Sequence, residues 1–168
     1  MDNLIIRKAI PDDAENILAF LNQVGGETDN LLFGLNEFIM PIKQEQEYIE
    51  SINNSNNSIM LIGIIDNEIA SVASIQGFSR KRIAHRGNIA VSVKKVFWHQ
   101  GIGKKMMMEL IKFAKEASIT VVELEVKSDN HGAIALYEGL GFERIGTYNK
   151  FFYIDGRYYD AYLMNLYL

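Results

Sequence analysis

Apolar and polar residues alternate along the first part of the chain in patterns that predict a strand, two helices and then a group of strands. Leu4–Ile5–Ile6, followed by Arg7, is a short apolar run typical of a strand, and a helix is predicted to begin at Pro11, because proline is tolerated in a first turn. Its apolar positions recur at helical spacing until Gly25–Gly26, which we expect to end it. A second helix is predicted over about 43–52, with residues 27–38 forming a loop or short helix before it.

The rest of the chain is predicted to contain strands joined first by hairpins and then by helices. Asp66–Asn67–Glu68 separates two apolar runs and is a strong hairpin signal. In chain order we predict strands at 59–65, 69–75 and 87–93, a helix at about 101–115, a strand at 119–126, a helix at 130–140, and two aromatic-rich strands around Asp155–Gly156. The order β-α-α-β-β-β-α-β-α-β-β predicts an α/β fold with a mixed sheet, antiparallel at the hairpins and parallel where a helix crosses over.

The composition is that of a globular protein and narrows the classes of function. The 168 residues suit one domain over 1–168, since neither an internal repeat nor a long linker interrupts them. The absence of cysteine removes disulfides and thiol chemistry, and the histidines lack metal-ligand spacing, so no metal is expected. No apolar run approaches the roughly 18 residues of a membrane span. Met1–Asp2–Asn3–Leu4 lacks a signal-peptide core, so we predict a cytoplasmic protein without membrane partners.

The net charge of -4 argues against a dedicated nucleic-acid-binding protein, which usually carries a basic domain. Three basic islands nevertheless stand out: Arg80–Lys81–Arg82, Lys94–Lys95 and Lys104–Lys105. They suit either a solvated surface or a protein that holds a phosphorylated cofactor and accepts a cationic partner.

A glycine-containing turn, Trp98–His99–Gln100–Gly101–Ile102–Gly103, lies between a predicted strand and a predicted helix. Glycine lets the backbone approach a ligand closely, and the first N–H groups of a helix are unpaired and attract an anion such as a diphosphate. The turn does not fit the P-loop, which needs glycine at Trp98 and Ser or Thr at Lys105, nor the dinucleotide motif, which needs glycine at Met106. By itself it is equally typical of a tight helix start.

A second motif, Asn130-x-x-Ala133-Ile134-x-Leu136-Tyr137-Glu138-x-x-Gly141-Phe142, follows after the next predicted strand. Together the two motifs closely resemble the GNAT acetyltransferase family, and the resemblance extends along nearly the whole chain. It implies the GNAT acyl-CoA N-acyltransferase fold, a mostly antiparallel sheet with a parallel, splayed centre and flanking helices. It also implies acetyl-CoA as cosubstrate and, since dimers are common in the family, a homodimer.

The resemblance assigns cofactor-binding roles by position. The strand end formed by Val91, Ser92 and Val93, split from its neighbour by a bulge, should bind the pantetheine arm through its backbone. The pyrophosphate should be held by the backbone of Trp98, His99, Gln100, Gly101, Ile102, Gly103 and Lys104. Asn130 should contact the arm, and Tyr137 should lie beside the thioester sulfur. The family usually has Gln or Arg in place of Trp98, and here Phe97 and Trp98 are expected to cover the cofactor.

Acetyl transfer to an amine requires two proton movements. An alkyl ammonium with a pKa near 10.4 is only about one part in 10³ neutral at pH 7, so a base or a water chain would assist. The departing thiolate needs a proton donor, for which we predict Tyr137 as general acid; its alternative role is that of a core aromatic. Many relatives carry a glutamate base near Asn88, and asparagine cannot accept a proton. Glu125 or a water chain is the alternative, while Glu27 and Asp29 are predicted as amine binders or as plain surface acids.

The leading hypothesis is an N-acetyltransferase that transfers the acetyl group of acetyl-CoA to a primary amine of a small molecule, by direct attack in a ternary complex. The alternatives are a protein or peptide N-alpha-acetyltransferase and a non-catalytic acyl-CoA-binding sensor, which Asn88 leaves open. Acceptor recognition is expected in residues 25–38, in residues 80–85 and in the aromatic tail. The tail side chains could wall an acceptor pocket or pair with another subunit: Tyr148, Phe151, Phe152, Tyr153, Tyr158, Tyr159 and Tyr162.

Overall fold

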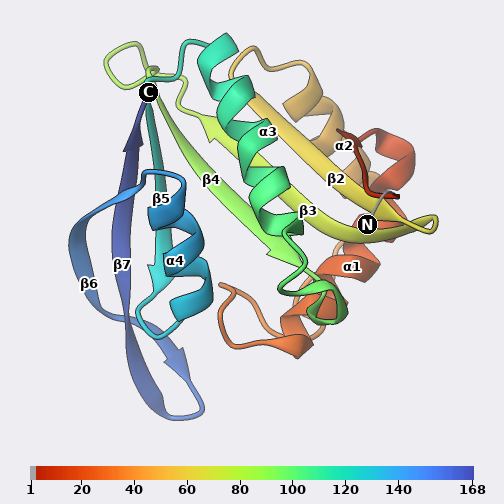
Figure 1. The fold of residues 1–168 in the computed structure, drawn as a ribbon. Coiled ribbons are helices and arrows are strands. Elements are labelled where there is room, and N and C mark those ends of the chain that lie inside the picture. The colour runs from red at the N-terminus through yellow and green to blue at the C-terminus, as the bar shows by residue number, and fades with distance from the viewer. Residues whose placement is uncertain (1–2) are drawn as a thin grey trace.

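The computed structural model describes residues 3–168; Met1 and Asp2, on which the signal-peptide prediction partly rests, lie outside them. The elements follow in this order (Figure 1): β1 (Ile5–Lys8), the 3-10 helix η1 (Pro11–Asp13), α1 (Ala14–Glu27), α2 (Ile42–Asn53), β2 (Ser58–Ile65), β3 (Glu68–Gly77), β4 (Arg86–Val93), the 3-10 helix η2 (Lys95–Phe97), α3 (Ile102–Glu116), β5 (Val121–Lys127), α4 (His131–Gly139), β6 (Glu143–Ile154) and β7 (Arg157–Tyr167). No helix within this described range is long and apolar enough to cross a membrane.

The strands form one mixed sheet with the order β1-β2-β3-β4-β5-β7-β6. Neighbouring strands pair antiparallel throughout, except for β4 and β5, which are parallel because α3 crosses between them. The predicted succession of elements and the predicted mixed, mostly antiparallel sheet are therefore confirmed.

Helices cover both faces of the sheet and enclose two apolar cores. α1 and α2 pack on one face, where Phe20 and Ile49 contribute to a core with Ile62 of β2. α3 and α4 lie on the other face, where Met106 and Tyr137 contribute to a second core (Figure 1). Between these two layers of helices, the end of β4 beyond Asn88 is not paired with β5.

The sheet opens between β4 and β5. Their pairing is limited to Arg86–Asn88 of β4 against Val121–Glu123 of β5, so the remaining residues of the two strands diverge (Figure 1). The predicted bulge is not found on the β3 side of β4, because that ladder keeps one register from Gly77 opposite Gly87 to Ser71 opposite Val93. The predicted splayed centre is present without it.

The prediction that Gly25–Gly26 ends the first helix is wrong, because α1 continues to Glu27. Both glycines instead allow the following loop to pack tightly against the helix. A Cβ atom on Gly25 would lie 2.2 Å from the carbonyl oxygen of Gly34, and one on Gly26 would lie 2.8 Å from Cδ1 of Leu35. The two glycines are therefore needed for the close approach of the loop to α1, and they do not themselves end the helix.

Candidate active site

The free edge of β4 faces the opening between β4 and β5. In an antiparallel ladder the residues of one strand alternate between those that bond their neighbour and those that point away from it. Lys94 N–H bonds Ala70 O, so the even-numbered residues of β4 bond β3, and the backbone groups of Val91 and Val93 point into the opening. Ser92 faces β3 instead, and its Oγ donates to Val72 O. Of the predicted pantetheine contacts, Val91 and Val93 therefore have the matching orientation.

Trp98 ties the loop after β4 back to the end of that strand. Its Nε1 donates a hydrogen bond of 2.8 Å to the carbonyl oxygen of Val93. The N–H of Val93 and both backbone groups of Val91 stay directed into the opening. Trp98, which stands where the family usually has Gln or Arg, thus fixes the turn before α3 to the end of β4 through the hydrogen bond of its indole N–H.

The start of α3 is suited to an anion. Gly101 adopts φ 77°, a left-handed conformation that favours glycine, and precedes the helix as its N-cap. The first turn contains no acidic residue, and its N–H groups at Ile102, Gly103 and Lys104 have no intrahelical partners. Gly103 faces Leu136 of α4 and Val93 of β4. The anion-binding end of α3 therefore adjoins the opening between β4 and β5.

The four lysines near this turn divide into two kinds. Lys94 is buried and forms an ion pair with Glu68 of β3, so it is directed away from the turn. Lys95 has its Nζ 5.9 Å from the centroid of the Trp98 ring. Lys104 and Lys105 are exposed in the first turn of α3. The charge available for a phosphate group comes from Lys104, Lys105 and Lys95, and not from Lys94.

Asn130 and Tyr137 are both on or next to α4, beside the opening. Asn130 is the N-cap of α4, and its Oδ1 accepts a hydrogen bond of 3.3 Å from Ala133 N–H. Tyr137 is buried against Phe142, and burial raises its pKa to about 12. The Tyr137 hydroxyl forms no hydrogen bond with residues 3–168, so it is available as a donor.

A cavity of about 430 Å³ lies on the other side of β4, between α1, the loop after it, α2 and strands β2 to β4. Its walls are mainly apolar and include Leu21, Leu31, Phe33, Phe38, Met40, Met60 and Val72. Ala90, Val91 and Ser92 of β4 also line it, on the part of that strand that diverges from β5. One carboxyl group, that of Glu45 in the first turn of α2, lines it.

Glu45 was missed by sequence reasoning, and the structure makes it the most unusual acid of the protein. Its residue is 4% exposed, and burial raises the pKa of its carboxyl group. The side chain has no hydrogen bond or ion pair with the described residues. The sequence carried only a weak signal for it, since Glu45 lies among polar residues of an amphipathic helix and looks like any surface acid.

The acids predicted from the sequence lie outside the cavity. Glu27 accepts a 2.7 Å hydrogen bond from Lys95 N–H, which joins the end of α1 to the loop after β4. Asp29 is exposed in the loop after α1. Asn88 Nδ2 lies 3.4 Å from Glu125 Oε2 across the beginning of the opening, and Glu125 is exposed. Glu27 therefore positions the turn, while Glu125 is an acid on the splayed strands themselves.

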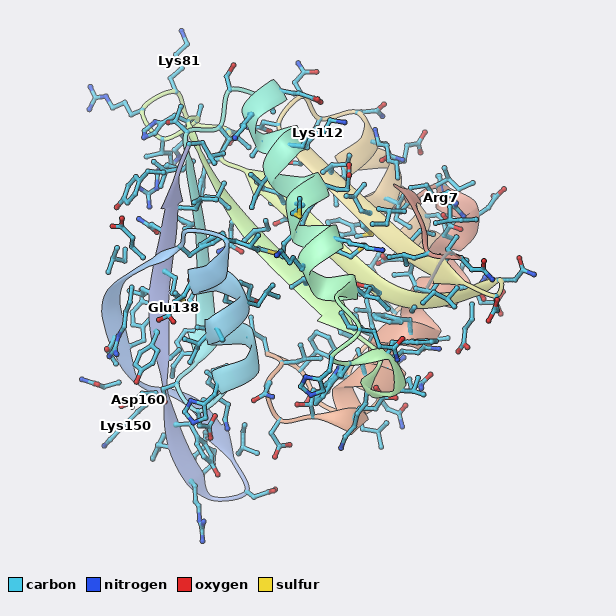
Figure 2. All side chains as sticks on the ribbon, viewed as in Figure 1. Arg7, Lys81, Lys112, Glu138, Lys150 and Asp160 are labelled. Atoms are coloured by element: carbon cyan, nitrogen blue, oxygen red, sulfur yellow. The ribbon has the colours of Figure 1, made fainter. Side chains whose placement is uncertain are left out.

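Two segments expected at the acceptor site lie elsewhere. Residues 80–85 connect β3 to β4 at the end of β4 opposite Val93, and Lys81 projects from that far end (Figure 2). None of the aromatic tail residues lines the 430 Å³ cavity, and Tyr148, Tyr153 and Tyr158 are exposed on β6 and β7. Of the three segments predicted to recognise the acceptor, only residues 25–38 contribute to the cavity.

The site can be compared with known proteins. The sequence profile described as acetyltransferase (GNAT) family matches residues 31–142. The L-amino acid N-acetyltransferase AaaT of Escherichia coli (strain K12) is 26% identical over 98% of both chains. A GNAT-family acetyltransferase from Streptococcus pneumoniae has a crystal structure that covers 98% of this chain and 99% of its own, with a TM-score of 0.95 and 30% identity.

A third relative matches only part of the chain. The N-alpha-acetyltransferase RimI of Mycobacterium tuberculosis (strain ATCC 25618 / H37Rv) is 38% identical over 74 residues, which is 44% of each protein. The matched segment therefore covers less than half the length of this curated relative. The shared segment does not extend to the whole of either protein, so it carries no statement about the acceptor.

Proposed function

The chain belongs to the acetyltransferase (GNAT) family and is an acetyl-CoA-dependent N-acetyltransferase, and we propose that its acceptor is a primary amine of a small molecule. Acetyl transfer occurs by direct attack of the amine on the thioester in a ternary complex. The observation that carries this proposal is the position of the opening between β4 and β5, which has the anion-binding start of α3 on one side and the cavity on the other.

The chain's own groups would hold acetyl-CoA along this opening. Both backbone groups of Val91 and the N–H of Val93 would pair with the amides of the pantetheine arm, as a neighbouring strand would. The free N–H groups from Ile102 to Lys104 would bind the pyrophosphate. The Nδ2 of Asn130 remains free to bond the arm, because its Oδ1 caps α4. These groups fit an extended, amide-containing chain that ends in a diphosphate.

Tyr137 would act on the departing sulfur. A hydroxyl with a pKa of about 12 stays protonated at neutral pH, so it can donate a hydrogen bond to the sulfur as the C–S bond breaks. It is a weaker acid than a thiol, whose usual pKa is about 8.5, so a lasting tyrosinate is unfavourable. The proton that Tyr137 gives to sulfur would therefore be replaced by the proton that the nitrogen loses after it has attacked the thioester, while the proton of the starting ammonium goes to a separate base.

Deprotonation of the amine can use Glu125 or a chain of water molecules. Glu125 is exposed beside Asn88, on the strand next to the opening, and its carboxylate can accept a proton where asparagine cannot. This arrangement supports catalysis despite Asn88, and it counts against the sensor alternative. If Glu125 is the base, Glu125→Gln should lower kcat more at pH 7 than at pH 9; if water suffices, it should leave kcat unchanged at both pH values.

Release of free coenzyme A thiol across a panel of small amines and peptide N-termini tests the proposal. Turnover with small amines and none with peptides supports it. Turnover with peptides alone would establish the N-alpha-acetyltransferase alternative. Tight binding of acetyl-CoA with no release for any acceptor would establish a sensor. Sedimentation of the same protein tests the expected homodimer.

A further inference from the structure

The cavity beside β4 holds a carboxyl group that no other side chain neutralises. Glu45 lies in the first turn of α2 with its residue 4% exposed, and it has no hydrogen bond or ion pair with residues 3–168. The carboxyl oxygens of Glu45 are not among the fully buried polar atoms and so reach the cavity, but a carboxylate in a mainly apolar cavity without a charged partner is less well hydrated than one at the surface. Every other buried acidic or basic side chain of the described range has a partner: Asp13 with Arg7, Lys94 with Glu68 and Lys127 with Asp129.

The surroundings of Glu45 show what kind of group would neutralise it. No lysine, arginine or histidine is among the side chains that line the cavity in residues 3–168. Tyr48, on the same helix, is another ionisable side chain that lines the cavity. Its hydroxyl accepts a hydrogen bond from Gln76 of β3, and its pKa is raised by burial and by the charge of Glu45. The remaining walls, from α1, the loop after it and strands β2 to β4, are apolar or neutral. A cation that pairs with Glu45 inside the cavity would therefore have to come from a ligand.

We propose that Glu45 binds the ammonium group of the acceptor, and that this acceptor is an amine with an apolar body and no carboxylate. This inference rests on the proposed function, because the cavity adjoins the opening at Ala90, Val91 and Ser92, where the thioester would lie. An apolar body would contact Leu21, Phe33 and Met60. A carboxylate on the same ligand would find no cationic partner there and would face Glu45 at close range.

Acceptors that differ by one carboxylate test the substrate class. For wild-type protein, kcat/KM for 2-phenylethylamine should exceed that for phenylalanine by about 10-fold or more, because the second ligand adds an unpaired buried charge. Equal or reversed values for the two ligands would overturn the inference about the acceptor.

Two glutamate substitutions on one helix test the residue. Glu45→Gln should raise KM for 2-phenylethylamine by about 10- to 100-fold, since a charge-assisted hydrogen bond is lost, while the Kd of acetyl-CoA stays within about 2-fold. Glu47→Gln is the matched control, because Glu47 is exposed and pairs only with Lys43, and it should leave both values unchanged. A KM that moves less than about 3-fold in Glu45→Gln would overturn the assignment.

A direct measurement separates failure of this inference from failure of the proposed function. Calorimetry would follow 2-phenylethylamine binding to protein saturated with coenzyme A, which cannot transfer an acetyl group. Binding that Glu45→Gln abolishes, together with no turnover, would retain the amine site and reject the transferase role for this amine. Absence of binding to the wild-type protein would overturn the inference even if other amines were acetylated. Equal melting temperatures or a higher value for Glu45→Gln would show that the variant is folded.

Discussion

At the scale of single residues, Tyr137 combines a free hydroxyl with deep burial, and this combination makes its role testable. Tyr137→Phe removes only the hydroxyl, so kcat should fall by about 10- to 100-fold while the Kd of acetyl-CoA changes by less than about 2-fold. Stopped-flow thiol release and equilibrium titration measure the two quantities. A kcat equal to that of the wild type would assign Tyr137 to the core alone.

The pH dependence of Tyr137 follows from its surroundings. Burial raises its pKa to about 12, so the hydroxyl stays protonated and its ionisation should cause no loss of kcat from about pH 7 to about pH 10. A downward limb in this range that disappears in Tyr137→Phe would show that the hydroxyl of Tyr137 loses its proton at a lower pH than its burial implies. The pH dependence of kcat is measured at saturating concentrations of the amine.

Glu45 affects stability as well as binding. Its folded-state pKa is raised by burial, so the folded protein binds more protons than the unfolded chain, and stability falls as pH rises through the folded pKa. Glu45→Gln lacks this loss and should melt at a higher temperature than the wild type at pH 7, with the difference shrinking as the pH falls and Glu45 becomes protonated in both states. Melting curves at pH 7 and at lower pH check this, and a lower melting temperature at pH 7 would show that Glu45 has a stabilising partner.

At the scale of elements, the junction of α1 with its following loop depends on Gly25. A Cβ atom there would collide with backbone, the Gly34 carbonyl, whereas on Gly26 it would meet the movable end of Leu35. Gly25→Ala should lower the free energy of unfolding by about 1–3 kcal/mol, and Gly26→Ala by less than about 1 kcal/mol. Urea unfolding compares the two variants. Equal losses would contradict the close contact between the loop and the helix.

The start of α3 offers a second matched pair. Gly101 has φ 77°, so Gly101→Ala strains the backbone by about 1–2 kcal/mol and should weaken acetyl-CoA binding by about 10-fold. Gly103 is helical, and a Cβ atom there would lie 3.5 Å from Leu136 Cδ2, an ordinary contact. Gly103→Ala should keep the Kd within about 2-fold, because the added methyl group meets no close atom. Isothermal titration of both variants decides whether backbone conformation controls the turn.

At the scale of the whole molecule, the bound cosubstrate should stabilise the two sides of the opening together. Acetyl-CoA at about 100 times its Kd should add about 2.7 kcal/mol to the free energy of unfolding, which is roughly 5–10 °C in melting temperature for a chain of this size. ATP at the same concentration lacks the pantetheine arm and should give a smaller shift. Equal shifts would mean that phosphate groups alone account for binding.

Local patterns in the sequence determined much of the fold. Apolar spacing placed the helices and strands, and Asp66–Asn67 was a reliable turn signal because both residues adopt positive φ, 48° and 65°, as a tight hairpin requires. The glycine turn and the Asn130-to-Phe142 motif pointed to the family because short segments next to a helix start bind phosphate through their own backbone. All of these features depend on neighbours within a few residues along the chain.

Only the tertiary structure decided which distant residues meet. Glu27 bonds a backbone group 68 positions away, Gly25 accommodates the loop that follows its own helix, and residues 80–85 lie at the far end of β4. Glu45 looked like a surface acid until the packing of α1, α2 and the sheet enclosed it in a cavity. The sequence by itself therefore determined the family and the cosubstrate, because local backbone chemistry encodes them. The cavity that we propose for the acceptor emerged only in three dimensions, because it depends on side chains that folding brings together.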